Sequence, residues 1–330
     1  MAKRQAEVAI WDARSEDYPF LCEVLAMQYG DMLKPEVLEA RDATVNASWS
    51  RRRLVLGLND GTRVGMATIM RIPTWKPGKV DVQIIVMPEF RRRGIGTKVA
   101  HWLADRAHEM EAKVLQVMTM DSDEESIRFG HSFGAVFDLS LFDLELDLAS
   151  FDIATFGCLI TGLEEMGYRF FPLSSVFDEE TAKRAFHDVV TSTDRDVPGE
   201  EDDEPRSYEE FAETTYTSYW FWPGGTTIAE KDGAWVGYSM VGPMVEGSVT
   251  SLGTGVRREH RGKGLATALK ALSLNAAKLA GYPMARTENA TTNIGMLRVN
   301  ERFGYRVVRG NTWWSVPLPL TKKELSDETQ

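Results

Sequence analysis

The sequence predicts an α/β protein with a mixed β-sheet of the α+β type, and it predicts that this fold occurs twice in tandem. Three observations lead there: the order of strand-like and helix-like segments, a glycine-rich loop between a strand and a helix in each half, and a repeated spacing of landmarks. With 330 residues, of which 43% are hydrophobic, the chain is long enough for two domains of ordinary size.

Hydrophobic patterns and turn signals define the elements of the first half. The strand-like runs 54–58 and 64–70 flank an Asn-Asp-Gly sequence at 59–61, which is typical of a tight hairpin turn. Apolar residues at helical spacing in 97–110 follow the glycine-rich loop at once. Around these, the sequence predicts strands at 8–11, 80–86, 114–120 and 139–148, and helices at 16–29 and 124–133.

The second half repeats this order of elements. Gly94 recurs as Gly264 and Phe133 recurs as Phe303, both after 170 residues, and a fixed interval indicates a duplicated domain. The expected elements are strands at 168–171, 226–230, 235–241, 247–256, 284–287 and 312–316, and helices at 178–191, 265–280 and 293–303. We therefore expect an N-terminal domain at 1–150, a linker helix at 151–167 and a C-terminal domain at 168–330.

Composition and charge exclude several classes of protein. A net charge of −11 repels nucleic acid and anionic lipid, so we expect neither as a partner, whereas a cationic acceptor such as an amine suits the chain. Cys22 and Cys158 have no metal-ligand spacing, and we expect no metal site. The absence of a signal-peptide pattern and of a long apolar run predicts a cytoplasmic protein. The acidic stretch 193–205 predicts a surface loop, or alternatively a lid.

Each glycine-rich loop predicts a binding site for a diphosphate. Backbone N–H groups and the positive end of the helix dipole attract an anion, and glycine lets the backbone come close to it. Arg91 and Arg261 can each add a charge-assisted contact. Neither loop has the Gly-Lys-Ser/Thr of a Walker A motif, and Val99 and Leu269 stand where a dinucleotide fingerprint has its third small residue.

Residues 86–96 and 256–266 resemble motif A of the GNAT superfamily of N-acetyltransferases, and residues 287–305 are similar to its motif B. The resemblance covers almost the whole chain, and the layout is similar to that of tandem members such as mycothiol synthase. It implies acetyl-CoA as the cosubstrate, bound by loops next to strands that splay open for the pantetheine. The implied cofactor contacts are Val86, Arg91, Arg92, Arg93, Gly94, Ile95, Gly96 and Thr97, then Val256, Arg261, Gly262, Lys263, Gly264, Leu265, Ala266, Thr267, Asn289 and Asn293.

The resemblance also implies a reaction that needs a base for the amine, an N–H for the oxyanion and an acid for the thiolate. Many members use a tyrosine as that acid, four residues before the motif B glycine, and this chain has Gly130 and Asn300 there. In the first half Asp123 replaces Asn293, and carboxylates beside an anionic cofactor are unfavourable. We therefore expect the C-terminal half to be catalytic.

The candidate catalytic residues of the second half are Glu246, Thr254 and Asn300. Glu246 precedes the strand that ends at residue 256 and is either a base or a solvated turn residue. Thr254 could hold a water that carries the proton instead. In the first half Asp81 is the analogue of Glu246.

Three functions remain open at this point. The first is an N-acetyltransferase acting on the amine of a small molecule, as a monomer or a homodimer. The second is an acetyl-CoA-binding sensor or scaffold without turnover, which the missing tyrosine favours. The third keeps the fold but acetylates a protein N-terminus or lysine.

Overall fold

The computed structural model describes residues 7–30, 33–43, 50–71, 78–194, 205–245 and 247–321. The chain divides into two compact units, Met1–Leu139 with Thr312–Gln330, and Ser140–Asn311. Each is built from strands of a mixed sheet with helices, so the predicted α/β fold class is confirmed. The predicted acidic loop lies for the most part outside the described residues.

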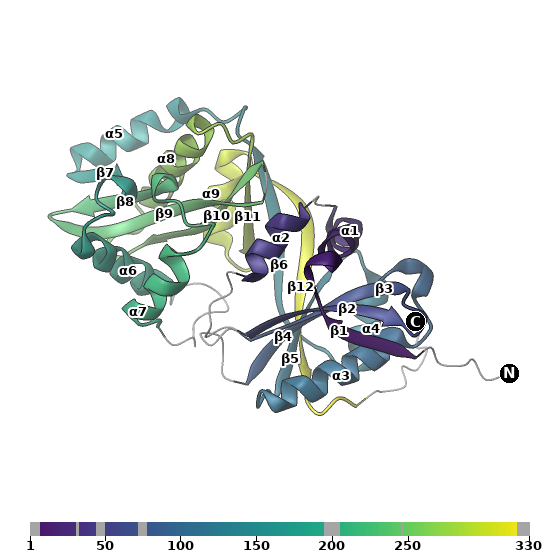
Figure 1. The fold of residues 1–330 in the computed structure, drawn as a ribbon. Coiled ribbons are helices and arrows are strands. Elements are labelled where there is room, and N and C mark those ends of the chain that lie inside the picture. Colours follow the sequence, from purple (N-terminus) through teal and green to yellow (C-terminus); the bar gives the residue numbers. More distant parts are fainter. Residues whose placement is uncertain are drawn as a thin grey trace. The chain divides into compact units, whose positions relative to one another are not determined.

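The first unit contains five strands that follow one another both in the sequence and in the sheet (Figure 1). The strands are β1 (Val8–Asp12), β2 (Ser50–Leu58), β3 (Arg63–Arg71), β4 (Lys79–Val86) and β5 (Val114–Met120). The first four pair antiparallel, and β4 and β5 pair parallel. The helices are α1 (Tyr18–Tyr29), α2 (Pro35–Ala43), α3 (Ile95–Glu109) and α4 (Glu124–Ser132).

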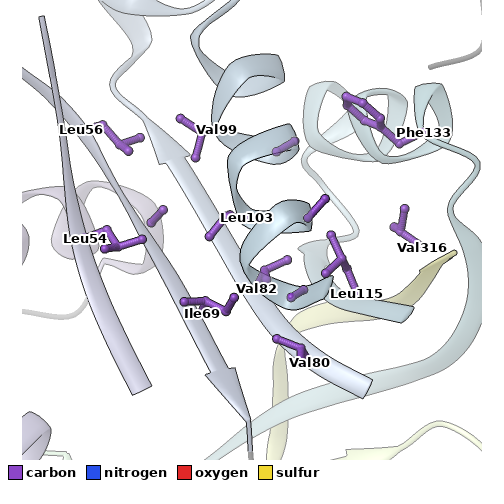
Figure 2. Packing of buried hydrophobic residues seen from close by; sticks show 14 of the residues in the cluster. Leu54, Leu56, Ile69, Val80, Val82, Val99, Leu103, Leu115, Phe133 and Val316 are labelled. Carbon is purple, nitrogen blue, oxygen red and sulfur yellow. The ribbon is translucent and has the colours of Figure 1, made fainter. Parts of the chain in front are cut away.

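Alternation along the strands places these helices on the two faces of the sheet. Leu54 and Leu56 of β2 pack in the cluster that holds Val99 and Leu103 of α3, whereas Val55 between them packs in the cluster of α1 and α2 (Figure 2). Because successive side chains of a strand point to opposite faces, the sheet is covered by α3 on one face and by α1 and α2 on the other.

The second unit repeats this arrangement with one additional helix near its start. Its strands, in sheet order, are β11 (Met284–Ala290), β10 (Ser248–Val256), β9 (Ala234–Val245), β8 (Thr226–Lys231) and β7 (Tyr168–Pro172). Its helices are α5 (Gly157–Glu165), α6 (Glu180–Asp194), α7 (Tyr208–Phe211), α8 (Leu265–Leu279) and α9 (Ile294–Phe303). Leu163 of α5 packs against α8, so a helix lies in the segment 151–167.

The last strand of each half completes the sheet of the other unit. Residues 140–147 of β6 (Val136–Asp147) belong to the second unit, where β6 pairs antiparallel with β11. Residues 312–317 of β12 (Arg306–Pro317) belong to the first unit, where β12 is the neighbour of β5 and Trp314 donates to Thr119 Oγ1 (2.9 Å). The compact units therefore depart from the expected ranges 1–150 and 168–330, because a strand pattern does not specify which sheet edge it completes.

Candidate functional site

The two glycine-rich loops adopt the same backbone conformation. A short 3₁₀ turn follows each strand, and a glycine with positive φ caps the helix that comes next: Gly94 (+81°) before α3 and Gly264 (+90°) before α8. Two residues earlier, Arg92 (+61°) and Gly262 (+76°) are also left-handed. The first N–H groups of a helix have no partner within it, so each loop directs several donors toward one point at the positive end of the helix dipole.

An arginine ties each loop to the strand before it. Arg91 Nε donates to the carbonyl oxygen of Val86 (3.0 Å), and Arg261 Nε donates to that of Val256 (2.8 Å). The contact is the same in both units, although only the second arginine is followed by glycine. Arg91 also lies 3.4 Å from Glu125 Oε2, and in both units the arginine shapes the loop through its bond to the strand end.

The other predicted loop residues divide into apolar anchors and exposed cations. Ile95 and Leu265 are buried in the cores of their units. The side chains of Arg93 and Lys263 return to backbone oxygens four residues earlier, Glu89 O at 2.7 Å and Glu259 O at 3.3 Å. The remaining loop positions predicted to contact the cofactor line the same two turns: Gly96 and Thr97 in α3, and Ala266 and Thr267 in α8.

Beside each loop, two parallel strands diverge. β4 pairs with β5 only from Lys79 to Asp81 and then continues to Val86. β10 pairs with β11 only from Ser248 to Thr250 and then continues to Val256. Beyond these points each strand has a backbone edge that can pair with an extended ligand. The splayed strands that the motif resemblance implied are present in both units.

The two diverging strands differ at the point where they part. β4 pairs with β3 in an unbroken register, from Gly65 opposite Val86 to Met70 opposite Asp81. β10 carries a bulge: Ser251 lies opposite Val241 and Gly253 opposite Met240, so Leu252 is the additional residue. Leu252 packs against the core cluster that contains Phe186 of α6 and Tyr238 of β9. A Cβ at Gly253 would lie 2.8 Å from the hydroxyl group of Tyr238. A bulge turns a peptide group out of the ladder, and bulges are enriched beside active sites.

Comparison with known families agrees with this geometry. The model of the acetyltransferase (GNAT) family matches residues 9–135 and 194–305, which together are more than half of the chain. The chain belongs to the GNAT family. It contains two GNAT domains in tandem, as the sequence predicted.

Solved structures of other GNAT proteins share the fold over nearly the full length. A GCN5-related N-acetyltransferase from Sphaerobacter thermophilus matches 96% of this chain and 98% of its own, with a TM-score of 0.73 and 17% identity. A tandem GNAT protein from the clavulanic acid biosynthesis pathway matches 96% and 100%, with a TM-score of 0.72 and 18% identity. No curated protein sequence matches the chain significantly. None of the described helices is long and apolar enough to cross a membrane.

The structure describes two of the three candidate catalytic residues of the second GNAT domain. Glu246 lies outside the described residues. Thr254 Oγ1 lies 2.9 Å from Ser239 Oγ, and the main chain of Ser239 accepts a hydrogen bond from Ser273 of α8. Thr254 therefore lies on the face of β10 that α8 covers. Asn293 Oδ1 accepts the N–H of Met296 (3.1 Å) and so caps α9.

Asn300 is fully buried and belongs to a polar chain that the sequence did not reveal. Lys270 Nζ of α8 donates to Asn300 Oδ1 (2.5 Å), and Asn300 Nδ2 donates to Asn289 Oδ1 of β11. Lys270 is 1% exposed, and its ammonium lies 4.8 Å from the centre of the Tyr305 ring. The Tyr305 hydroxyl lies 3.3 Å from Ser251 Oγ. Ser251 directly follows the last residue of β10 that pairs with β11. Burial lowers the pKa of Lys270 to about 7.

A comparison of the two halves of the sequence contains a signal that could have identified these hydrogen-bonded residues. At an offset of 170 residues, Lys270 corresponds to Ala100 and Tyr305 to Ala135. A lysine that replaces alanine on the buried face of a repeated helix is unusual, because charged side chains are rarely buried unless they are paired. The first domain instead has a carboxylate at the divergence point, and burial raises the pKa of Asp81 to about 7, although Arg51 opposes this.

Proposed function

We propose that the protein transfers the acetyl group of acetyl-CoA to an amine of a small molecule, and that the C-terminal GNAT domain performs the transfer. The bulge at Leu252 carries this assignment. The amine nitrogen attacks the thioester carbon, the oxygen gains negative charge, and a backbone N–H directed out of the ladder stabilises that charge. The nitrogen then gives up a proton, the carbon–sulfur bond breaks, the departing thiolate takes up a proton, and the amide and CoA leave. The regular β4 keeps its peptide groups in the ladder.

The cofactor residues proposed for this domain follow from its loop and its open strand edge. The pyrophosphate would lie at the start of α8, within reach of Arg261 and the N–H groups from Gly262 to Thr267. The pantetheine would pair with β10 up to Val256, between that strand and Asn289 of β11. The loop of the first domain has the same backbone, so we propose that it also binds acetyl-CoA, without turnover.

A matched pair of variants tests which domain is catalytic. Gly264→Glu places a carboxylate in the anion site at a φ of +90°, and Gly94→Glu does the same in the first domain at +81°. We expect CoA release from acetyl-CoA and an amine to fall by 100-fold or more in Gly264→Glu, on the order of two lost charge-assisted contacts, and to change little in Gly94→Glu. Equal loss in both variants, or no loss in either, would contradict the assignment.

A second pair controls for misfolding, because a Cβ at Gly264 would lie 2.8 Å from Leu159. A Cβ at Gly262 meets no atom within 4 Å, and the equivalent residue of the first domain, Arg92, already has a side chain. Gly262→Glu and Arg92→Glu should therefore give the same ordering of activities. The φ of +76° at Gly262 strains the new side chain, but without a clash Gly262→Glu should lower the melting temperature less than Gly264→Glu does.

The absence of the tyrosine favours one alternative, an acetyl-CoA-binding protein without turnover. Gly130 and Asn300 stand at the two positions, and neither side chain can act as an acid. Calorimetric binding of acetyl-CoA without CoA release across a panel of amines would select this alternative. Transfer to peptides in preference to small amines would select a protein acceptor. The cytoplasmic location and the state as a monomer or homodimer stay predictions.

A further inference from the structure

The buried polar chain of the second domain has a fixed direction. Lys270 Nζ donates to Asn300 Oδ1, and the ammonium form of Lys270, which has donors only, fixes this orientation of the amide. The amide nitrogen of Asn300 then faces Asn289, and the atom that receives it must be the Asn289 carbonyl oxygen. Each amide is thus turned in one sense only, and the amide nitrogen of Asn289 is directed away from the chain.

Asn289 lies on one wall of the opening between β10 and β11. The last residue of β11 that pairs with β10 is Arg286, three residues earlier. The opposite edge of β11 remains paired at Asn289, which lies across from Phe142 of β6. A group on Asn289 that is not used by Asn300 is therefore beside the path proposed for the pantetheine arm, which carries two amide carbonyls and ends in the thioester carbonyl.

We propose that Lys270 is a positioning residue for acetyl-CoA, which orients Asn300 and through it Asn289, so that Asn289 presents an N–H donor to a carbonyl of the cofactor arm. The proposal rests on the C-terminal domain being the one that binds acetyl-CoA productively. It concerns the recognition of a carbonyl group, which is a weaker contact than that of the pyrophosphate, and it assigns Lys270 no contact with the substrate.

The fold itself does not need this chain. The first domain has the same helices and strands with Ala100, Gly130, Thr119 and Ala135 at the positions of Lys270, Asn300, Asn289 and Tyr305. Burying a lysine costs stability, and here the Tyr305 ring and a single amide oxygen are what compensate it. A costly group that one copy of the fold lacks is more simply explained by a role in the site than by a role in packing.

Three variants of the second domain interrupt the chain in different ways. Lys270→Met removes the donor and keeps the length of the side chain. Asn300→Asp keeps an acceptor for Lys270 and puts a carboxylate oxygen in place of the N–H that holds Asn289, so Lys270 stays paired while Asn289 loses its donor. Asn289→Ala removes the group that is presented. We expect each to weaken acetyl-CoA binding about 5–10-fold, the effect of one hydrogen bond to a ligand.

Ser273→Ala is the matched control. Ser273 lies on the same helix, is fully buried, and donates to the carbonyl oxygen of Ser239 (2.9 Å) without contact to the asparagines. It should lower the melting temperature and leave the affinity for acetyl-CoA unchanged. The double variant Lys270→Met/Asn289→Ala should bind acetyl-CoA no more weakly than Asn289→Ala alone, because both changes remove the same donor.

The affinity for acetyl-CoA, measured by calorimetry, and the KM and kcat of transfer decide the outcome. If Lys270→Met and Asn300→Asp lower only the melting temperature, as Ser273→Ala does, Lys270 is structural and the proposal is wrong. If Lys270→Met does not fold, the affinity of Asn300→Asp alone decides between the two roles. These binding measurements use a Gly94→Glu background, which removes the site proposed for the first domain. In that background, acetyl-CoA binding that survives Gly264→Glu would overturn the proposed function itself, whereas binding lost in Gly264→Glu but intact in Asn300→Asp overturns this inference only.

Discussion

The two GNAT domains of this chain have nearly identical glycine-rich loops and different strands beside them. The loops share the left-handed glycine before the helix and the arginine bonded to the strand end. The strands beside the loops differ. In the first domain β4 is regular and has Asp81 where it parts from β5. In the second domain β10 is bulged, and the buried Lys270 is hydrogen-bonded to Asn300. The backbone of the loop, which we propose binds an anion, is the same in both domains, whereas the side chains and the strand register beside it differ. Binding and turnover can therefore separate after a duplication.

Removing the bulge should give the largest effect. Deleting Leu252 removes the bulge between Ser251 and Gly253 and returns the peptide groups there to the ladder with β9, while the register shift between Ser248 and Thr250 remains. We expect kcat to fall roughly 100–1,000-fold, the usual cost of losing one oxyanion donor, with acetyl-CoA binding retained. Steady-state assays of CoA release measure kcat, and calorimetry measures the affinity for acetyl-CoA. A variant that keeps its kcat would remove the main argument for the C-terminal domain.

The two arginines should differ in their effect on turnover and agree in their effect on structure. Arg261→Met and Arg91→Met each remove the same bond to a strand-end carbonyl. We expect Arg261→Met to raise the KM for acetyl-CoA about tenfold, since a charge-assisted contact is worth roughly 1.5–3 kcal/mol, and Arg91→Met to leave KM unchanged. A larger effect of Arg91→Met than of Arg261→Met on the KM for acetyl-CoA would contradict the assignment of catalysis to the C-terminal domain.

The buried lysine should make stability depend on pH above neutrality. Burial lowers the pKa of Lys270 from 10.5 to about 7, so between these values the unfolded chain binds more protons than the folded chain. The free energy of unfolding should therefore rise with pH from 7 to 9, by up to about 1.4 kcal/mol per unit. Urea unfolding of Lys270→Met should lack this rise. An identical slope in the parent and the variant would show that Lys270 is not neutralised by folding.

Asp81 should have the opposite dependence in the first domain. Burial raises its pKa from 3.8 to about 7, so the folded chain binds more protons between these values and stability falls as the pH rises through them. At pH 8 we expect Asp81→Asn to have a higher melting temperature than the parent protein. At pH 4 we expect its melting temperature to be equal to that of the parent or lower. Thr250→Ala, at the last residue of β10 that pairs with β11, as Asp81 is the last of β4 that pairs with β5, should show no such dependence. Thermal melting at the two pH values provides the measurement.

The conformation of the two glycine-rich loops could be predicted before the structure. Gly94 and Gly264 were identified by their place between a strand and a helix, and both adopt the positive φ that the turn requires. The candidate catalytic residues were harder, because their neighbours come from other elements. Thr254 meets Ser239 of the adjacent strand, and Asn300 meets Lys270, thirty residues earlier in the chain. No local pattern specifies such pairs.

The sequence by itself determined the order of the elements, the duplication and the two anion loops, because periodicity, turn chemistry and the spacing of glycines act over a few neighbouring residues. Only the tertiary structure decided which unit each last strand joins, where β10 is bulged, and that Lys270, Asn300 and Asn289 form one chain. Sheet edges, register and buried polar contacts depend on a partner that is distant in sequence. In this protein, those distant partners are what distinguish one GNAT domain from the other.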